Sequence, residues 1–322
     1  MTLTQRLDEA MRLENLLPNT RKVYHFWVRS LYRFNGKPAS TWTGDDVRAW
    51  LLDLDRKLYS PVSRKQALNA VVFVFRHVLK RDLGQLDLPP MPRVHQTLRV
   101  VPSRGELGRI FAGLRGQSKL MAALMYGSGL RVGCECVKLR VKDIDLSGRT
   151  VNVWNGKGDK SRRTVLPAML APAMQRHLAW VKSIHDQDLA NGGGLVELPG
   201  RLAVKYKHAN REFAWQWLFP SNVVRGQYRW HATPEALRKQ MRAAIKAAGI
   251  NKLITPHCLR HAFVTHGLQS GNDLPTMMKL VGHEDANTTM IYAHGDVAQG
   301  INPMDGTIRH LPIAVDFTHL IA

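Results

Sequence analysis

Three short segments of the chain gather residue types that suit chemistry at a phosphodiester. The first ends in Arg131, the second contains His257 and Arg260, and the third runs from His283 to Tyr292. Two guanidinium groups can bind the non-bridging oxygens of a phosphate bidentately and neutralise the charge that grows in the transition state. Imidazoles can donate to the same oxygens or move protons near neutral pH. A tyrosine can attack phosphorus and hold it covalently, which conserves the bond energy for rejoining without a metal.

A lysine in a predicted hairpin turn completes this set. The turn Asn155-Gly156-Lys157-Gly158-Asp159-Lys160 joins two segments with strand patterns. Its central lysine is placed to protonate the departing 5′ oxygen of a cleaved strand. Each of these residues alone also has a structural explanation, because single tyrosines and histidines mostly pack within a fold and a turn lysine is often only solvated. The order and spacing of the residues carry the prediction.

The same residues disfavour two other kinds of site. Lys157 does not belong to a Walker A loop, because Val151 stands where the first glycine is required and Gly158 follows the lysine. His257 and His261 have the i, i+4 spacing of metal ligands, but no glutamate follows His257 and no third ligand is evident. We therefore expect neither a metal nor a cofactor.

The chain is strongly basic. Its 322 residues include 46 Lys and Arg against 25 Asp and Glu, a formal net charge of +21. The excess lies within periodic, foldable sequence, because residues 1–100 carry +8, residues 101–260 carry +17 and residues 261–322 carry −4. The expected partner is an extended polyanion, nucleic acid first and an anionic membrane surface second. A charge excess can also serve only solubility.

Cysteine content and hydropathy bear on the location of the protein. Cys134, Cys136 and Cys258 are too few for a disulfide framework and suit a reducing compartment. No signal peptide is readable, and the longest apolar stretch, 67–75, contains Asn69 and is too short to span a bilayer. We therefore expect a cytoplasmic protein without a membrane partner.

The first ninety residues show the helical spacing of apolar residues. One helix is predicted to begin near residues 19–20, a second after a cap at Thr43, and a third at Ser60-Pro61. Their apolar stripes consist of Val23, Phe26, Trp27 and Leu31; of Val47, Trp50, Leu51 and Leu54; and of Leu68, Val71, Val72, Phe75 and Leu79. The basic residues between these stripes that we expect to contact nucleic acid are Arg21, Lys22, Arg64 and Lys65.

A proline-rich break divides the chain. Three prolines within 88–93 cannot continue a helix and favour an extended linker. A second helical run is predicted from Arg104 to about Arg140, followed by strands around 149–154 and 164–166 and by further helices from Ala171. The expected fold is mainly α with a small antiparallel β-sheet (α+β). Its expected parts are a helical domain over 1–87, a linker over 88–100, a second domain over 101–305 and a tail over 306–322.

From about residue 5 to residue 305 the chain resembles the tyrosine recombinases, or site-specific integrases. The residues that carry the resemblance are Gly129-Leu130-Arg131, Gly156-Lys157-Gly158, His257-Cys258-Leu259-Arg260-His261, Gly282-His283 and Tyr292. It implies a helical core-binding (SAM-like) domain and a catalytic domain that form a C-shaped clamp on DNA. It also implies that the tyrosine forms a 3′-phosphotyrosyl link. The catalytic residues implied are Arg131, Lys157, His257, Arg260, His283 and Tyr292.

The acidic residue after Arg131 departs from the family pattern. The family typically has it three positions after this arginine, whereas Glu135 lies four positions after it, as if a residue near Cys134 were inserted. On a helix both spacings stay near Arg131, so we expect Glu135 to support it. A π-type bulge is needed to keep the downstream face in place. We expect full or reduced activity rather than none.

A second resemblance narrows the family. At about 195–221 lies an aromatic-rich segment similar to the extra segment of integron integrases, which binds bases extruded from a folded single strand. Aromatic faces stack on such bases, and nearby basic residues meet phosphates. Alternatively, Trp215, Trp217 and Phe219 form one face of a core strand. The residues that we expect to contact DNA in this half of the chain are Trp215, Trp217, His231, Lys160 and Arg162.

The two resemblances together imply a bacterial integron integrase that inserts and excises gene cassettes at attI and attC sites. The runner-up is an ordinary double-strand integrase of a phage or transposon. The alternative of another class is a catalytically impaired DNA-binding protein on the same scaffold. Related enzymes exchange C-terminal segments, so the tail 306–322 predicts a homo-tetramer on synapsed DNA, with a frayed terminus as the other explanation.

Overall fold

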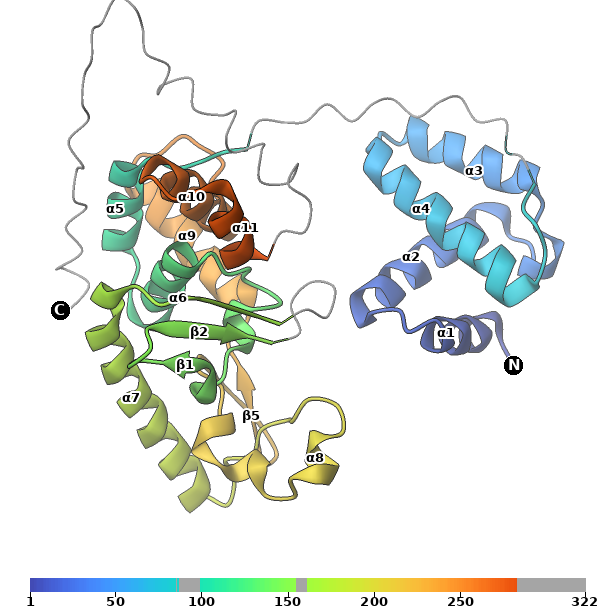
Figure 1. Cartoon of the computed structure of the whole chain (residues 1–322). Helices are drawn as coiled ribbons and strands as arrows, with labels where there is room; N and C mark the ends of the chain where they lie inside the picture. The colour runs from blue at the N-terminus through green and yellow to red at the C-terminus, as the bar shows by residue number, and fades with distance from the viewer. Residues whose placement is uncertain (85, 87–98, 155–160, 283–322) are drawn as a thin grey trace, which may run out of the picture. The chain divides into compact units, whose positions relative to one another are not determined.

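The computed structural model describes residues 1–84, 86, 99–154 and 161–282 (Figure 1). The chain divides into two compact units, Met1–Thr97 and Leu98–Ala322, and each has its own hydrophobic core. Most described residues are helical, and the strands form two small antiparallel sheets. This architecture confirms the predicted fold class. Over the described ranges, no helix has the length and apolar character that crossing a bilayer requires.

The N-terminal unit is helical throughout its described elements. They are α1 (Leu3–Leu13), α2 (Pro18–Asn35), the 3-10 turn η1 (Ala39–Thr41), α3 (Gly44–Arg56), α4 (Pro61–Phe73) and the π-helical segment η2 (Val74–Leu79). The predicted cap at Thr43 is present, and Ser60 caps α4 in the same way: both side chains accept backbone N–H groups of the first turns of their helices. Such caps satisfy donors that have no partner within the helix.

The apolar stripes of these helices build the core of the unit. Trp27 and Trp50 are buried, and their rings meet edge to face with centroids 6.2 Å apart. The predicted burial of two residues in these stripes is wrong, because Phe26 is 54% exposed and Val72 is 39% exposed. Both follow or precede a buried neighbour directly in sequence. The 100° step between successive helix residues turns such a neighbour toward solvent at the edge of a stripe.

The C-terminal unit packs helices around a three-stranded sheet. Its described α-helices and strands are α5 (Arg104–Gly113), α6 (Gly116–Ser128), β1 (Ile144–Asp145), β2 (Thr150–Val153), β3 (Arg162–Val165), α7 (Ala171–Ala190), α8 (Leu202–Lys205), β4 (Pro220–Arg225), β5 (Tyr228–His231), α9 (Pro234–Ala247), α10 (Pro256–Gln269) and α11 (Leu274–Val281). The sheet order is β1-β2-β3, and Val153 pairs with Arg162 at the end of the β2-β3 pair that leads to residues 155–160. The hairpin β4-β5 forms a separate sheet.

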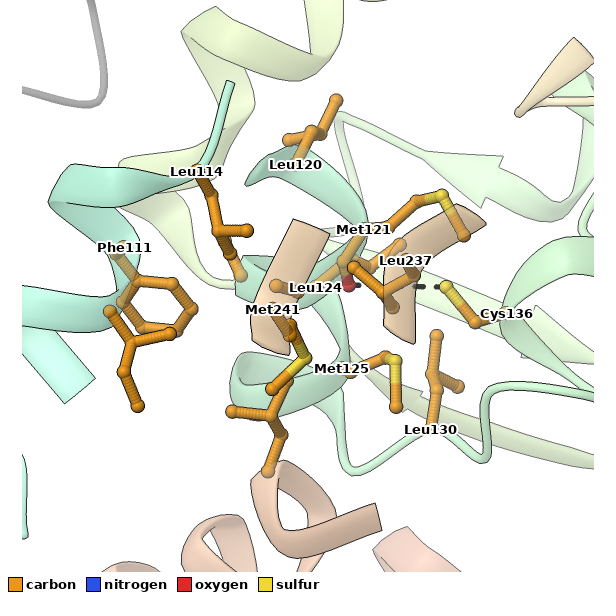
Figure 2. Close-up of a cluster of buried hydrophobic side chains, with 14 of the residues drawn as sticks. Phe111, Leu114, Leu120, Met121, Leu124, Met125, Leu130, Cys136, Leu237 and Met241 are labelled. Carbon is orange, nitrogen blue, oxygen red and sulfur yellow. Dashed lines mark hydrogen bonds between the residues drawn. The ribbon is translucent and has the colours of Figure 1, made fainter. Parts of the chain in front are cut away.

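Helix α6 lies at the centre of this unit's core. Leu124 and Met125 on α6 are fully buried, and Leu237 and Met241 of α9 pack into the same cluster (Figure 2). The Cys136 thiol lies 3.9 Å from the carbonyl oxygen of Met121, which the dashed line in Figure 2 marks. This core supports the two segments that carry the arginine clusters, because Leu130 and Leu259 are also buried in it.

The predicted helical run from Arg104 to about Arg140 is wrong after residue 128. The run breaks between α5 and α6, and α6 ends at Ser128. Gly129 caps α6 in the left-handed conformation, with φ +65°. A Cβ at this position would lie 2.6 Å from the Phe263 ring, so tertiary packing as well as backbone conformation requires glycine. Arg131 therefore follows the end of a helix and does not lie within one.

Candidate functional site

Glu135 and Arg131 belong to a compact turn and not to a helix. The backbone N–H of Cys136 donates to the carbonyl of Arg131 at 2.8 Å, and that of Val137 donates to the carbonyl of Val132 at 3.2 Å. Both bonds span five residues, the spacing of a π-turn, which accommodates one residue more than an α-turn. The Glu135 carboxylate folds back and accepts the Arg131 N–H at 2.8 Å and Nη1 at 2.6 Å. The expected contact is therefore present, although the predicted helix is not.

The Glu135 carboxylate is the centre of a cluster of guanidinium groups. Its side chain has no exposed surface, and Arg162 of β3 donates to both of its oxygens, from Nη1 at 2.9 Å and Nη2 at 2.8 Å. Arg260 Nη1 lies 3.8 Å from the same carboxylate. Burial alone would raise the pKa of Glu135, but the hydrogen bonds and charges of Arg162 and Arg131 outweigh it and lower the pKa to about 2.

Helix α10 brings the second cluster to the same place. Thr255 occupies the N-cap position of the helix, and Pro256 lies in its first turn. Arg260 is 2% exposed and donates to the carbonyl oxygens of Gly129 and Val281, each at 2.6 Å. It thereby joins the end of α6 to the end of α11.

His257 lies beside this guanidinium cluster. Partial burial lowers the pKa of its imidazole, and the positive charges of Arg260 and Arg131 lower it further. The ring packs edge to face on the His261 ring, with centroids 4.4 Å apart. The structure therefore brings Arg131, His257 and Arg260 together. Among the other expected site residues, Lys157, Lys160, His283 and Tyr292 lie outside the described residues.

Replacement of Glu135 by glutamine is expected to lower the free energy of unfolding at pH 7 by about 3 kcal/mol. The pKa of Glu135 is about 2 in the folded protein against an ordinary value of 4.5, and each pKa unit corresponds to about 1.4 kcal/mol. A lowered pKa stabilises the fold above pH 4.5, and this stability is lost as the pH falls toward 2. The difference between E135Q and wild type should therefore shrink from pH 7 to pH 3.

Urea unfolding of the full chain at both pH values measures this difference. Glu212 provides the control, because its side chain is exposed and the described residues show no ion pair for it. E212Q should unfold like the wild type at both pH values. Equal unfolding midpoints for E135Q and wild type at pH 7 would show that the buried carboxylate does not stabilise the fold.

An aromatic cavity lies next to the Glu135 turn. Its volume is about 690 Å³, and Cys134 and Lys138, which flank Glu135 in sequence, are among its lining residues. The aromatic residues that line it are Trp154, Trp215, Trp217, Trp230 and His231. They come from the end of β2, from the 3-10 turn η7 (Phe213–Trp215) and the residues after it, and from β5. Three segments distant in sequence thus build one concave aromatic surface.

Two cations lie against the aromatic rings of this cavity. Lys142 Nζ lies 4.5 Å from the centre of the Trp215 ring and 5.1 Å from that of Trp154. The Arg140 guanidinium lies 3.7 Å from the centre of the Trp217 ring and donates to the carbonyl oxygens of Trp215 and Glu197 at 2.7 and 2.6 Å. Such a surface can stack a planar ring and attract a negative charge beside it.

Trp217 and Trp215 have different surroundings. Trp217 is 7% exposed, its Nε1 donates to the Arg229 carbonyl at 3.2 Å, and Phe219 beyond it is fully buried. Phe219 and most of the Trp217 side chain therefore belong to the core, as the alternative explanation predicts. Trp217 is not part of a regular strand, since its backbone forms an isolated β-bridge with Arg140. Trp215 is half-buried and keeps part of its ring at the cavity.

Arg162 does not have the position expected of a DNA contact. Its side chain is 11% exposed and is bonded to Glu135 and to the Leu280 carbonyl at 2.9 Å. Sequence reasoning also missed Trp154, Trp230, Arg140 and Lys142 as cavity residues. Only their residue types, large aromatic and basic, could have indicated them. Local sequence patterns do not show that residues at separate strand ends and turns come together in the fold.

The basic residues expected to contact DNA in the N-terminal unit differ in accessibility. Lys22 and Lys65 are exposed, whereas Arg21 and Arg64 are half-buried. Arg64 also forms an ion pair with Asp55, with Nη1 2.6 Å from the carboxylate. The two lysines are therefore the more accessible members of this set.

The chain matches two family models and curated relatives. Residues 106–299 match the phage integrase family, and residues 3–85 match the phage integrase N-terminal SAM-like domain. An integrase/recombinase of Escherichia coli is 38% identical over 301 residues, covering 90% of this chain and 88% of that protein. A tyrosine recombinase XerC of Halalkalibacterium halodurans is 31% identical and covers 77% of this chain and 76% of its own.

Solved structures share the fold. An integrase of the Tn1549 transposon in complex with transposon right end DNA has a TM-score of 0.64 at 17% identity, over 91% of this chain and 94% of its own. A lambda integrase dimer bound to a core site has a TM-score of 0.61 at 14% identity, over 97% and 100%. The matches to family models, the similar proteins and the shared fold all indicate the same family. The chain belongs to the phage integrase family, and it is a tyrosine recombinase, an enzyme that cleaves and rejoins DNA strands.

Proposed function

We propose that this recombinase is an integron integrase that inserts and excises gene cassettes at attI and attC sites. The aromatic cavity is the observation that carries the proposal. A folded single-stranded attC site presents bases outside its helix, and sequence-tolerant stacking on aromatic rings is a physical means of binding them. Trp215 and Trp230 line the cavity, and Lys142 places a positive charge within 4.5 Å of the centre of one of these rings. The reaction takes place in the bacterial cytoplasm.

The proposed catalytic residues are those that the family resemblance implies. Arg131 and Arg260 bind the non-bridging oxygens of the scissile phosphate, and His257 donates to the same phosphate. Tyr292 attacks phosphorus and forms a 3′-phosphotyrosine while the 5′ oxygen leaves with a proton from Lys157. His283 assists at the phosphate. The reverse attack of a 5′ hydroxyl on the phosphotyrosine restores the tyrosine and seals the new strand, so the reaction needs no metal.

The lowered pKa of His257 affects how it acts. A neutral imidazole beside two guanidiniums can donate one N–H to the phosphate without adding a further buried positive charge. Binding of a phosphate supplies negative charge and favours the protonated form. His257 therefore suits proton movement at the moment when the phosphate is bound.

Binding preference separates this function from that of a double-strand integrase. We expect the protein to bind the folded bottom strand of an attC site more tightly than the same sequence as a duplex, as measured by gel shift at one fixed salt concentration. An equal or greater affinity for the duplex would favour an ordinary phage or transposon integrase. Binding without any covalent adduct would favour a catalytically impaired DNA-binding protein.

Truncation of Trp215 is expected to reduce binding of the folded strand alone. Loss of one stacked base costs about 1–3 kcal/mol, which corresponds to a roughly 5- to 150-fold weaker Kd for the folded attC strand. Duplex attI binding should change little, because a paired base does not enter the cavity. The matched control is Trp180→Ala on α7, since Trp180 is 42% exposed and does not line the cavity. Equal losses on both DNA forms would contradict a base-binding role.

We further propose that residues 306–322 exchange between protomers in a homo-tetramer on synapsed DNA. The net negative charge of residues 261–322 makes this part of the chain suited to a protein surface rather than to DNA. The helical unit over 1–87 binds DNA through Lys22 and Lys65, with the linker 88–100 between it and the catalytic domain.

A further inference from the structure

We propose that Arg162 is a positioning residue for Arg131 and acts through Glu135. It holds the Glu135 carboxylate so that this carboxylate orients Arg131 without occupying its phosphate-binding donors. The inference rests on the proposed role of Arg131 at the scissile phosphate. Arg162 itself touches no substrate in this assignment, because each of its three side-chain nitrogens already donates to Glu135 or to the Leu280 carbonyl.

The two arginines bind the carboxylate in different ways. Arg162 donates one Nη to each carboxylate oxygen, at 2.9 and 2.8 Å, in the planar bidentate arrangement. Arg131 donates only Nη1 from its side chain, at 2.6 Å, and its backbone N–H supplies the other contact at 2.8 Å. In the part of the chain that the structure describes, Nε and Nη2 of Arg131 carry no hydrogen bond within the protein. They form a pair of parallel donors of the kind that binds a phosphate.

Without Arg162 the carboxylate would be free to turn toward the neighbouring guanidinium. A buried carboxylate pairs with the nearest donors that satisfy both of its oxygens. Arg131 is the nearest remaining partner, and a bidentate pair with it would occupy a second nitrogen of that side chain. The phosphate would then lose one of its donors. Arg162 thus keeps Glu135 in a one-point contact with the Arg131 guanidinium.

Arg162 also joins this arrangement to the end of α11. Its Nε donates to the Leu280 carbonyl at 2.9 Å, and α11 packs beside β3. Its Cδ lies against Gly282, where an added Cβ would be 3.0 Å away. Gly282 directly precedes His283 in sequence. One side chain on β3 therefore connects the Arg131 turn with α11, the helix that precedes His283 in sequence.

Variants at position 162 test the inference on a defined probe. The probe is the folded bottom strand of an attC site with a nick beside the scissile phosphate, which traps the covalent adduct because the short cleaved fragment diffuses away. We expect R162Q to lower the single-turnover rate of adduct formation by roughly 100-fold, as for a misplaced catalytic group. The Kd for the same DNA should change by less than about threefold, because the phosphate contacts of the rest of the interface persist. R162K should not restore the rate, since an ammonium cannot make the planar bidentate pair.

The adjacent Arg163 provides the matched control. It is exposed on the same strand and donates to Asn152 at 3.1 Å, so R163Q removes the same charge without touching Glu135. R163Q should form the adduct at the wild-type rate. If R162Q does not fold, as judged by its melting temperature, R162K carries the test alone, and a wild-type rate for R162K would overturn the inference.

A double-mutant cycle isolates the action through Glu135. Once E135Q has removed the carboxylate charge, R162Q should cause little further loss of rate, so the two effects should not add. Fully additive losses would overturn the inference. Failure of the proposed function looks different, because the wild-type protein and R163Q would then form no adduct at all.

Discussion

Replacement of Tyr292 by phenylalanine is expected to abolish covalent adduct formation while leaving DNA binding intact. The substitution removes only the hydroxyl oxygen that the proposed mechanism bonds to phosphorus, and the remaining phenyl ring carries no nucleophile. The wild-type protein should convert the nicked attC hairpin into a protein–DNA adduct that survives denaturing electrophoresis. Y292F should show no such band at any incubation time.

Gel-shift affinity is the control for this variant. Y292F should bind the folded strand with the wild-type Kd, because the ring and the basic surface are unchanged. An adduct formed by Y292F would show that a residue other than Tyr292 is the nucleophile. Adduct formation by neither protein, with normal binding by both, would leave a DNA-binding protein as the function of this chain.

Removal of the Arg131 side chain is expected to lower the rate of strand cleavage by roughly 10²–10³-fold. This is the loss that follows when one preorganised donor to a transition-state oxyanion is deleted. Arg131 has two side-chain nitrogens without a protein partner among the described residues, and Glu135 holds its Nη1 at 2.6 Å. The guanidinium is therefore already oriented before DNA binds, so little reorganisation is needed in the reaction.

Single-turnover adduct formation measures this rate, and R131K refines the test. A lysine keeps the charge but loses the planar pair of donors, so it should recover only part of the rate. Arg176→Ala on α7 is the control, because Arg176 is an exposed arginine of the same unit outside the described cluster. A near wild-type rate for R131A, with the melting temperature preserved, would remove Arg131 from the catalytic residues.

Local interactions explain which parts of the fold could be predicted from sequence. Thr43 caps its helix as predicted, and Ser60 caps the next one, because a capping side chain bonds backbone groups two or three residues away. The prediction failed at 129–140, where the residue types favour helix but Gly129 adopts φ +65° beside the Phe263 ring. That ring lies more than a hundred residues away in sequence, so no local pattern reports it.

The sequence by itself determined the chemistry that is available. The order of Arg131, Lys157, His257, Arg260, His283 and Tyr292 and the net charge of +21 are covalent facts that no fold alters. They were sufficient for the family, which the comparisons confirm.

Only the tertiary structure decided which groups face one another. Arg162 donates to Glu135, which lies 27 positions earlier in the sequence, and does not extend into solvent. Trp154 and Trp230 line the same cavity as Trp215. The physical reason is that buried charges and aromatic rings interact through space over a few ångströms, whereas spacing in sequence constrains only neighbours within about one helical turn or strand pair.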